Sequence, residues 1–372
     1  MRTRAIIIGI ASLLLLGSAT AVIAQVQVHG FLLARTIVTN NNYGARIDRY
    51  GLRILQKVDD EFDLLTEVYI HPSEADARSR VYMESAFLNW HLKQRLPWDF
   101  NVRIGKGRNF CYGIAPSYAN RRTSDYTLYS ESFTQLRVTG FQTFSNFGNA
   151  QLAIAIVNPY TQSSRMFPDF PIGNCIPIPI CDRDNDTIAI KNRVGVSGRL
   201  GYKTTMLNVG ASGFVSQTGP DKAGGVKQKN AINRFGLDGE LKLSSGLMAQ
   251  AQFTLASTPS DLDSLGVKGK KDKIPETDLS HNGGEVLVGW ENWSTYKSGL
   301  YARYGMLTYD DKLQGLNQIM VSAVYKIRPN IHLRLEGLIN GEETGSKKGP
   351  NKDQTWVKCN NDVLFFETCF EW

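Results

Sequence analysis

The sequence has few of the residues that build disulfide-stapled domains, metal centres or cofactor sites. It contains 5 cysteines and 5 histidines among 372 residues, which is too few for a disulfide-dense scaffold. The histidines show no metal-ligand spacing, at positions His29, His71, His91, His281 and His332. A Gly-x-x-x-x-Gly-Lys phosphate loop is missing, and no serine and histidine stand out as a catalytic pair. We therefore expect no metal, no cofactor and no catalytic residue.

Long apolar runs are also missing after residue 24. Residues 1–24 carry Arg2 and Arg4 ahead of an apolar run, which is shorter than the roughly 20 residues of a membrane-spanning helix. Small residues follow, with Val22 and Ala24 placed before Gln25. This pattern is typical of a cleaved secretory signal peptide. We expect an exported protein whose mature domain covers residues 25–372.

Neither disorder nor nucleic-acid binding suits the composition. Hydrophobic residues make up 42% of the chain and aromatic residues 10%, which is more apolar surface than a disordered chain keeps in water. The formal net charge of +7 falls to +5 when Arg2 and Arg4 are removed with the leader. Such a mild charge on an exported chain does not indicate a nucleic-acid partner.

From Gln25 onward the sequence repeats segments of about ten residues in which apolar and polar side chains alternate. This period of two is typical of strands with one apolar face. We expect about sixteen strands, over residues 25–38, 49–58, 62–71, 80–93, 100–107, 133–144, 151–158, 188–202, 205–217, 233–243, 247–257, 285–293, 299–309, 317–327, 331–340 and 362–372.

The connections between these segments alternate strictly between tight turns and long irregular loops. The longest lie at 108–132, 159–187, 218–232, 258–284 and 341–361. Outer-membrane barrels have short periplasmic turns and longer external loops, whereas a soluble sandwich has no reason to keep this asymmetry. The sequence therefore predicts an all-β fold: a closed antiparallel transmembrane barrel of about sixteen strands.

The last ten residues, VLFFETCFEW, follow the same two-faced pattern. Leu364, Phe366 and Phe370 share one face of an extended chain, and Glu367 and Glu371 the other. A closed barrel needs its last strand to pair with its first. We expect the apolar faces to meet lipid and the charged faces to line the lumen, with cations (Arg35, Arg49, Arg53, Lys57, Arg103, Arg137, Lys191, Arg193, Arg199, Arg234, Arg303, Arg334) outnumbering anions (Glu67, Asp238, Glu240, Glu285, Glu291, Glu336, Glu367, Glu371).

With this strand pattern, the chain resembles the bacterial outer-membrane porins. RYGLRILQKVDDEFDLLTEVYI and ESAFLNWHLKQRLPWDFNVRIGKGRNFCYGIAPS, within residues 27–160, resemble the phosphate-selective porin O and P family. The resemblance implies a water-filled outer-membrane channel for small hydrophilic solutes, with a mild preference for anions such as phosphate. It also implies a homotrimer, contacts with outer-membrane lipid and lipopolysaccharide, and assembly by the barrel assembly machinery.

The third long loop, 108–132, is the predicted constriction, since the porin resemblance implies a loop folded into the lumen. Its candidate residues are Arg108, Arg121, Arg122, Asp125 and Tyr126. A loop that only caps the mouth is the alternative. Anion preference follows from the predicted excess of cations along the wall.

Several alternatives stay open. Cys175 and Cys181 flank a proline-rich loop and are predicted to form a disulfide, while Cys111, Cys359 and Cys369 are unassigned. The acidic loop DRDND at 182–186 is a weak calcium candidate, because Thr187 stands where a calcium loop needs glycine. A barrel hydrolase and a structural or adhesive barrel with a closed lumen are the alternative functions.

Overall fold

The computed structural model describes the chain in segments, and statements about the structure apply to these residues. They are 25–39, 43–71, 80–92, 96, 98–114, 122–123, 127, 129–134, 137–158, 162–166, 177–181, 194–217, 222–223, 226–227, 231–259, 278–292, 298–309, 316–342 and 362–372. No described helix is long and apolar enough to cross a membrane.

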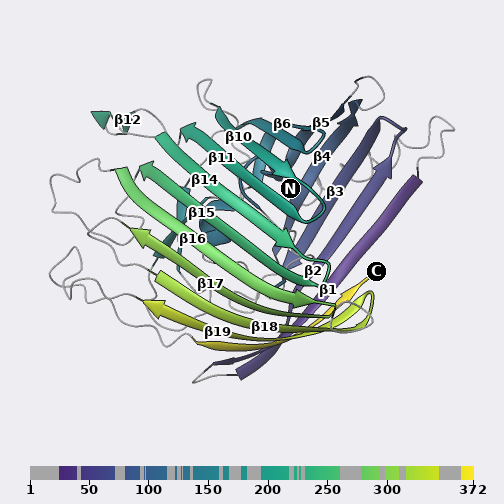
Figure 1. The fold of residues 1–372 in the computed structure, drawn as a ribbon, viewed down its shortest axis with the longest axis vertical. Coiled ribbons are helices and arrows are strands. Elements are labelled where there is room, and N and C mark those ends of the chain that lie inside the picture. Colours follow the sequence, from purple (N-terminus) through teal and green to yellow (C-terminus); the bar gives the residue numbers. More distant parts are fainter. Residues whose placement is uncertain are drawn as a thin grey trace, which may run out of the picture.

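Sixteen antiparallel strands form a closed barrel (Figure 1). Consecutive barrel strands are neighbours, and β20 closes the barrel on β1 through a register that runs from Phe31 opposite Glu371 to Thr39 opposite Val363. The strands are β1 Gln25–Thr39, β2 Tyr43–Lys57, β3 Phe62–His71, β4 Arg80–His91, β5 Asp99–Arg108, β6 Arg137–Phe147, β7 Ala150–Val157, β10 Gly195–Lys203, β11 Leu207–Gln217, β14 Ala231–Lys242, β15 Leu247–Pro259, β16 Asp278–Glu291, β17 Gly299–Tyr309, β18 Leu316–Arg328, β19 Ile331–Glu342 and β20 Val363–Glu371.

Two small hairpins lie in the connections between barrel strands. β8 (Gln162–Met166) pairs with β9 (Pro177–Cys181), and β12 (Lys222–Ala223) pairs with β13 (Val226–Lys227). At the other end of the barrel the strands join through tight turns. In the turn from β6 to β7, Gly148 takes a φ of 61°, a conformation that glycine adopts without steric cost and that two-residue hairpin turns require.

The predicted fold class is confirmed, and each predicted segment overlaps one barrel strand. Two boundaries differ in an informative way. β2 begins at Tyr43, where it pairs with Val38, so the connection 40–42 is short on the side predicted to carry long loops. β6 begins at Arg137 rather than near residue 133, because residues Ser130–Thr134 form a short π-helix.

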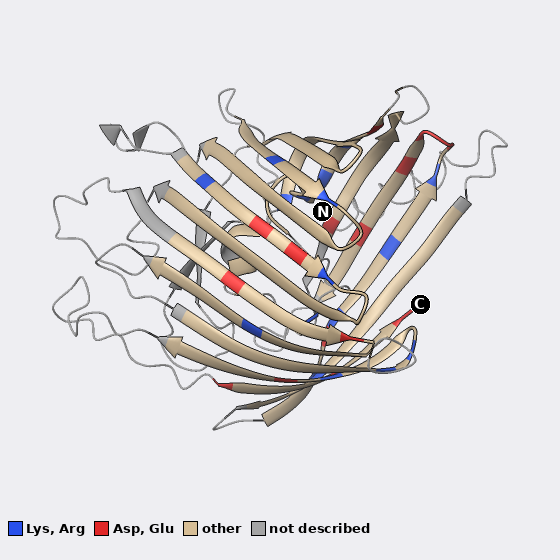
Figure 2. Ribbon diagram, viewed as in Figure 1, with Lys and Arg blue, Asp and Glu red and all other residues tan. Residues whose placement is uncertain are grey.

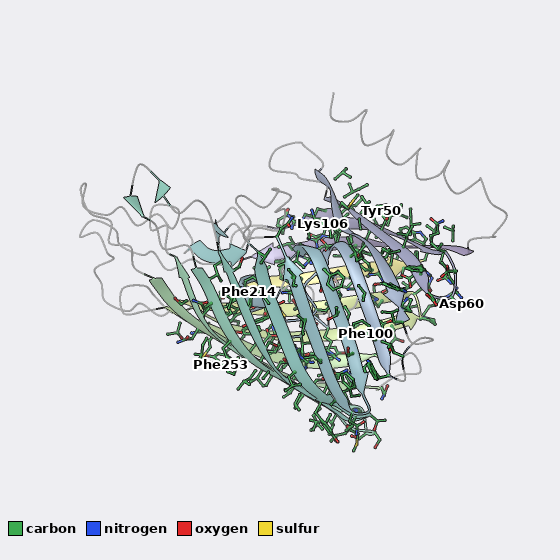
Figure 3. The ribbon with its side chains drawn as sticks, turned by 90° about the horizontal axis from the view of Figure 1, so that it is seen from above. Tyr50, Asp60, Phe100, Lys106, Phe214 and Phe253 are labelled. Atoms are coloured by element: carbon green, nitrogen blue, oxygen red, sulfur yellow. The ribbon has the colours of Figure 1, made fainter. Side chains whose placement is uncertain are left out.

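Side chains alternate between the two faces of the barrel wall. On β20, Leu364, Phe366 and Phe370 are exposed on the outer face, whereas Phe365 and Glu367 are buried on the inner face. The same contrast is found on other strands, where Phe253 of β15 is exposed and Phe214 of β11 is buried; both residues are labelled in Figure 3. The outer face is therefore an apolar belt.

The inner face is not uniformly polar, although the sequence predicted a charged lumen. Met320, Leu338, Val363 and Phe365 form one buried apolar cluster on β18, β19 and β20. Met248, Leu287, Tyr301 and Val324 form another on β15–β18. Part of the interior is therefore packed like a protein core.

Candidate functional site

The segment that follows β5 lies against the inner face of β11, β14 and β15. The Ile114 backbone N–H donates to Gln252 Oε1 at 2.7 Å, and Gln252 Nε2 donates back to the Ile114 carbonyl at 3.2 Å. The Gly113 N–H donates to Ser212 Oγ at 3.1 Å. Tyr112 and Tyr129 both hydrogen-bond Thr254 Oγ1, at 3.0 and 2.7 Å. We call residues 109–134 the inner loop.

Arg122 joins the inner loop to two carboxylates of the barrel wall, one on β14 and one on β16. Its Nε donates to Glu291 Oε1 at 3.1 Å, and one terminal nitrogen donates to Glu240 Oε1 at 2.8 Å. The other terminal nitrogen donates to Gln250 Oε1 at 3.3 Å. Because the guanidinium has fixed fork geometry, three such bonds hold both its position and its orientation. We call this set of contacts the Arg122 latch.

Tight packing also holds the π-helix of the inner loop. Phe133 is fully buried, and a Cβ added at Gly283 would collide with its ring. The Phe133 carbonyl accepts a hydrogen bond from Arg234 at 3.3 Å. Arg303 donates to Thr123 Oγ1 at 2.7 Å from β17. Glycine at position 283 therefore leaves the space that the aromatic side chain occupies.

A buried thiol lies at the start of the inner loop. Cys111 is fully buried, and burial raises the pKa of its thiol to about 12, against a smaller opposing effect of Arg103. Its backbone N–H donates to Asn109 Oδ1, which also accepts from Ser197 Oγ at 3.1 Å. The Cys111 thiol stays protonated at neutral pH and adds no charge to the interior.

Arginines cluster around single carboxylates on the inner wall. Glu84 of β4 pairs with Arg137 of β6 and lies 3.6 Å from Arg108 of β5. Where β20 closes the barrel on β1, Glu367 of β20 pairs with Arg35 of β1, at 2.9 Å, and with Arg334 of β19. Each of these two carboxylates faces two guanidinium groups. At Glu84 this leaves an excess of positive charge on β5 and β6, whereas the charge of Arg35 is also offset by Asp48, 3.6 Å away.

Acidic residues gather on a different part of the wall. Figure 2 shows acidic bands on β14 and β16, which include Asp238, Glu240 and Glu285. Arg199 donates to Asp238 at 3.0 Å through its Nε, and Gln252 donates to Glu285 at 2.9 Å. The inner loop lies over this acidic side, where its own Arg122 binds Glu240.

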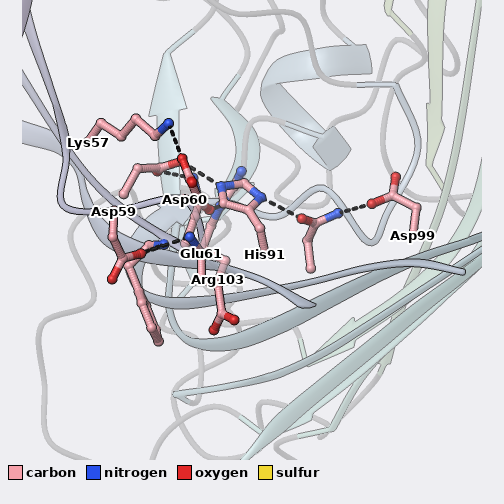
Figure 4. A network of polar contacts seen from close by, with 11 residues as sticks. Lys57, Asp59, Asp60, Glu61, His91, Asp99 and Arg103 are labelled. Carbon is pink, nitrogen blue, oxygen red and sulfur yellow. Dashed lines mark hydrogen bonds and ion pairs between the residues drawn. The ribbon is translucent and has the colours of Figure 1, made fainter. Parts of the chain in front are cut away.

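A polar network links the short-turn ends of β3, β4 and β5 (Figure 4). His91 Nε2 lies 2.6 Å from Asp63 Oδ2, and its Nδ1 lies 2.6 Å from Asn101 Oδ1. Asn101 donates its side-chain nitrogen to Asp99 at 2.9 Å. Because the Asp99 carboxylate can only accept, the Asn101 oxygen must face His91, and both ring nitrogens of His91 then donate. A doubly protonated His91 satisfies every member of this chain.

The predicted site residues fall into three groups. Arg108 and Arg122 lie inside the barrel and are paired with carboxylates. Of the predicted lumen charges, Arg49, Glu67, Arg137 and Arg334 are buried, whereas Arg53, Arg103 and Arg199 are partly exposed. Outside the described residues lie Arg121, Asp125, Tyr126, Arg193, Cys175 and the acidic loop 182–186; Cys181 lies in β9 without a described side chain. The constriction and the disulfide stay predictions.

Two acidic residues of the inner wall were missed, and both lie at β-bulges; Asp48 also lies just before the predicted segment 49–58. Between Arg49 and Ile47 the pairing of β2 with β1 skips Asp48, whose carboxylate lies 3.6 Å from Arg35. Between Ser85 and Met83 the pairing of β4 with β3 skips Glu84. A bulge adds one residue and shifts the alternation of faces. The excess of inward cations is therefore smaller than strict alternation predicts.

Comparison with known proteins identifies the fold. The structure resembles an anion-selective porin from Comamonas acidovorans, with a TM-score of 0.59 and 10% identity over 94% of this chain and 99% of that one. The chain has the porin fold. The outer membrane channel DcaP of Acinetobacter baumannii matches with a TM-score of 0.63 and 11% identity, over 95% and 99% of the two chains. OmpT of Vibrio cholerae, solved in a trimer form, matches with a TM-score of 0.57 and 13% identity, over 94% and 99%.

No protein-family model and no curated protein matches the sequence. The predicted likeness to the phosphate-selective porin O and P family therefore stays a prediction. What the three barrels named above share with this chain is the arrangement of strands, at identities of 10–13%.

Proposed function

We propose that the protein is an outer-membrane channel through which small hydrophilic solutes diffuse passively. The observation that carries the proposal is the closed barrel with an apolar outer belt and an inner wall that holds charged side chains beside its two apolar clusters. Lipid accepts an apolar surface without unpaired backbone groups, and closure removes both sheet edges. In this proposal residues 1–24 act as the signal for export and are then removed.

The inner loop sets the width of the channel in this proposal. Its contacts with Ser212, Gln252 and Thr254 support a position across the interior rather than over the mouth. Arg108, Arg121, Arg122, Asp125 and Tyr126 contribute to the constriction. Since Arg122 is held by Glu240 and Glu291, its main part is to anchor the loop.

A mild anion preference, extending to phosphate, is the finer part of the proposal. The arginine clusters around Glu84 and Glu367 support it. They lie away from β14, β15 and β16, where Arg122 makes its described contacts, so the inner loop is not held against them by Arg122. Arg122 also offsets the charge of the acidic side. The Comamonas barrel carries the description anion-selective. A homotrimer is the assembly we propose.

Swelling of liposomes that contain the purified full-length mature protein tests the channel. Uncharged sugars of increasing size should enter at rates that fall with size, because a water-filled constriction sieves solutes. A barrel closed by the inner loop and the apolar clusters is the second candidate, and it predicts no swelling with any sugar. Hydrolysis of lipid or peptide by the same preparation would instead favour a barrel enzyme.

A further inference from the structure

Three different metal-binding side chains meet on the inner wall near the short-turn end of the barrel. His332 of β19 and Cys369 of β20 are paired directly across the two strands. Glu371 lies two residues further along β20 and therefore on the same face. The ligand atoms of all three lie within 4.8 Å of one another, and His332 Nδ1 is 3.9 Å from Glu371 Oε1.

The arrangement suits a borderline divalent cation such as Zn²⁺. Zinc takes histidine nitrogen, cysteine sulfur and carboxylate oxygen at about 2.0–2.3 Å, which puts neighbouring ligand atoms about 3.3–3.7 Å apart in a tetrahedron. The three donors reach that spacing if their side chains close in by about 1 Å. Harder cations such as Ca²⁺ prefer oxygen ligands alone, so a thiol and an imidazole disfavour them.

Beside His332, Cys369 and Glu371 there is room for a cation to enter and for a fourth ligand to bind it. A cavity of about 520 Å³ is lined by Glu371 together with His29, Arg53 and Glu67. The carboxylate is part-exposed, whereas His332 and Cys369 are buried at 6% and 1% exposure. A cation can therefore approach through the carboxylate and complete its coordination with water from the cavity.

We propose that His332, Cys369 and Glu371 form a three-ligand site for Zn²⁺ or a similar cation at this end of the barrel interior. Binding displaces the proton of the Cys369 thiol, so the metal is held by a thiolate, a neutral imidazole and a carboxylate. Lys326, which pairs with His332 across β18 and β19, acts electrostatically on both His332 and Glu371. Its positive charge weakens the site.

Titration of the purified full-length mature protein in detergent with Co²⁺, under a phosphine reductant, tests the site. Bound Co²⁺ should give the absorption of a tetrahedral ion and a thiolate-to-cobalt charge-transfer band, and Zn²⁺ should displace it. Cys369→Ser should abolish the charge-transfer band. His332→Gln and Glu371→Gln should each weaken Co²⁺ binding by about tenfold or more. Replacing a residue that only hydrogen-bonds a metal ligand already lowers metal affinity by about that factor.

Two further variants separate a metal site from a structural cluster. Cys111→Ser removes the other buried thiol of the described residues and should leave the band unchanged. Lys326→Gln should tighten Co²⁺ binding by about threefold or more, because a nearby cation is removed. Heat-modifiable migration on gels checks that each variant is folded. The proposal is overturned if the wild type shows no charge-transfer band, or if the band survives in Cys369→Ser.

Discussion

Replacing Arg122 by glutamine should release the inner loop from the wall. The Arg122 side chain is 23% exposed, and its partners Glu240 and Glu291 are 16% and 32% exposed, so solvent screens these pairs only in part. A hydrogen bond to a charged group contributes about 1.5–3 kcal/mol. Because the bonds share one side chain and do not add fully, we take about 3 kcal/mol for the Arg122 latch.

Losing about 3 kcal/mol of stabilisation of the wall-bound loop raises the fraction of molecules whose inner loop has left the wall about a hundredfold. Amide hydrogen exchange measured by mass spectrometry reports this directly, because exchange follows the opening equilibrium. In Arg122→Gln, peptides within the inner loop, residues 109–134, should exchange up to about a hundredfold faster. The melting temperature of the barrel should change little, since the strand ladders are untouched.

The matched control is Arg199→Gln. Arg199 also pairs with an inward carboxylate, Asp238, at 3.0 Å through its Nε, and its described hydrogen bonds go to the wall residues Asp238 and Asn208. This variant should leave exchange in the inner loop unchanged. Equal exchange in wild type and Arg122→Gln, or equal acceleration in both variants, would refute the latch.

Three other changes probe the packing, the bulge and the outer face. Gly283→Val should accelerate exchange in the inner loop, because its side chain collides with the Phe133 ring, whereas Gly213→Val, with open space around it, should not. Glu84→Gln leaves buried guanidinium groups without their carboxylate and should lower the unfolding free energy by about 3–5 kcal/mol, measured by denaturant titration in detergent. Phe366→Arg places a charge on the outer face and should cost about 2–4 kcal/mol, seen as a reduced folded fraction on heat-modifiability gels; a normal folded fraction would contradict the face assignment.

The strand framework could be predicted from the sequence because its physical cause is local. A strand with one face toward lipid and one toward the interior must alternate with period two, as Leu364–Glu367 do on β20. Turn residues add a second local signal, such as Gly148 between β6 and β7. Each predicted segment therefore corresponds to one strand.

The interior was harder to predict because its contacts join residues far apart in the chain. Arg122 was a predicted pore residue, but nothing in its neighbourhood identifies Glu240 and Glu291 as its partners. Bulges at Asp48 and Glu84 change which face a residue occupies, and the alternation pattern does not locate them. The meeting of His332 with Cys369 likewise depends on strand register.

Current through a planar lipid bilayer containing the purified full-length mature protein tests the central claim most directly. A water-filled channel predicts discrete steps of current whose size grows with salt concentration, because ions cross through water. In a salt gradient, the reversal potential should also show anions crossing more readily than cations. Protein that is folded by heat-modifiable migration yet gives no current steps would contradict the channel, and would leave a barrel closed by its inner loop.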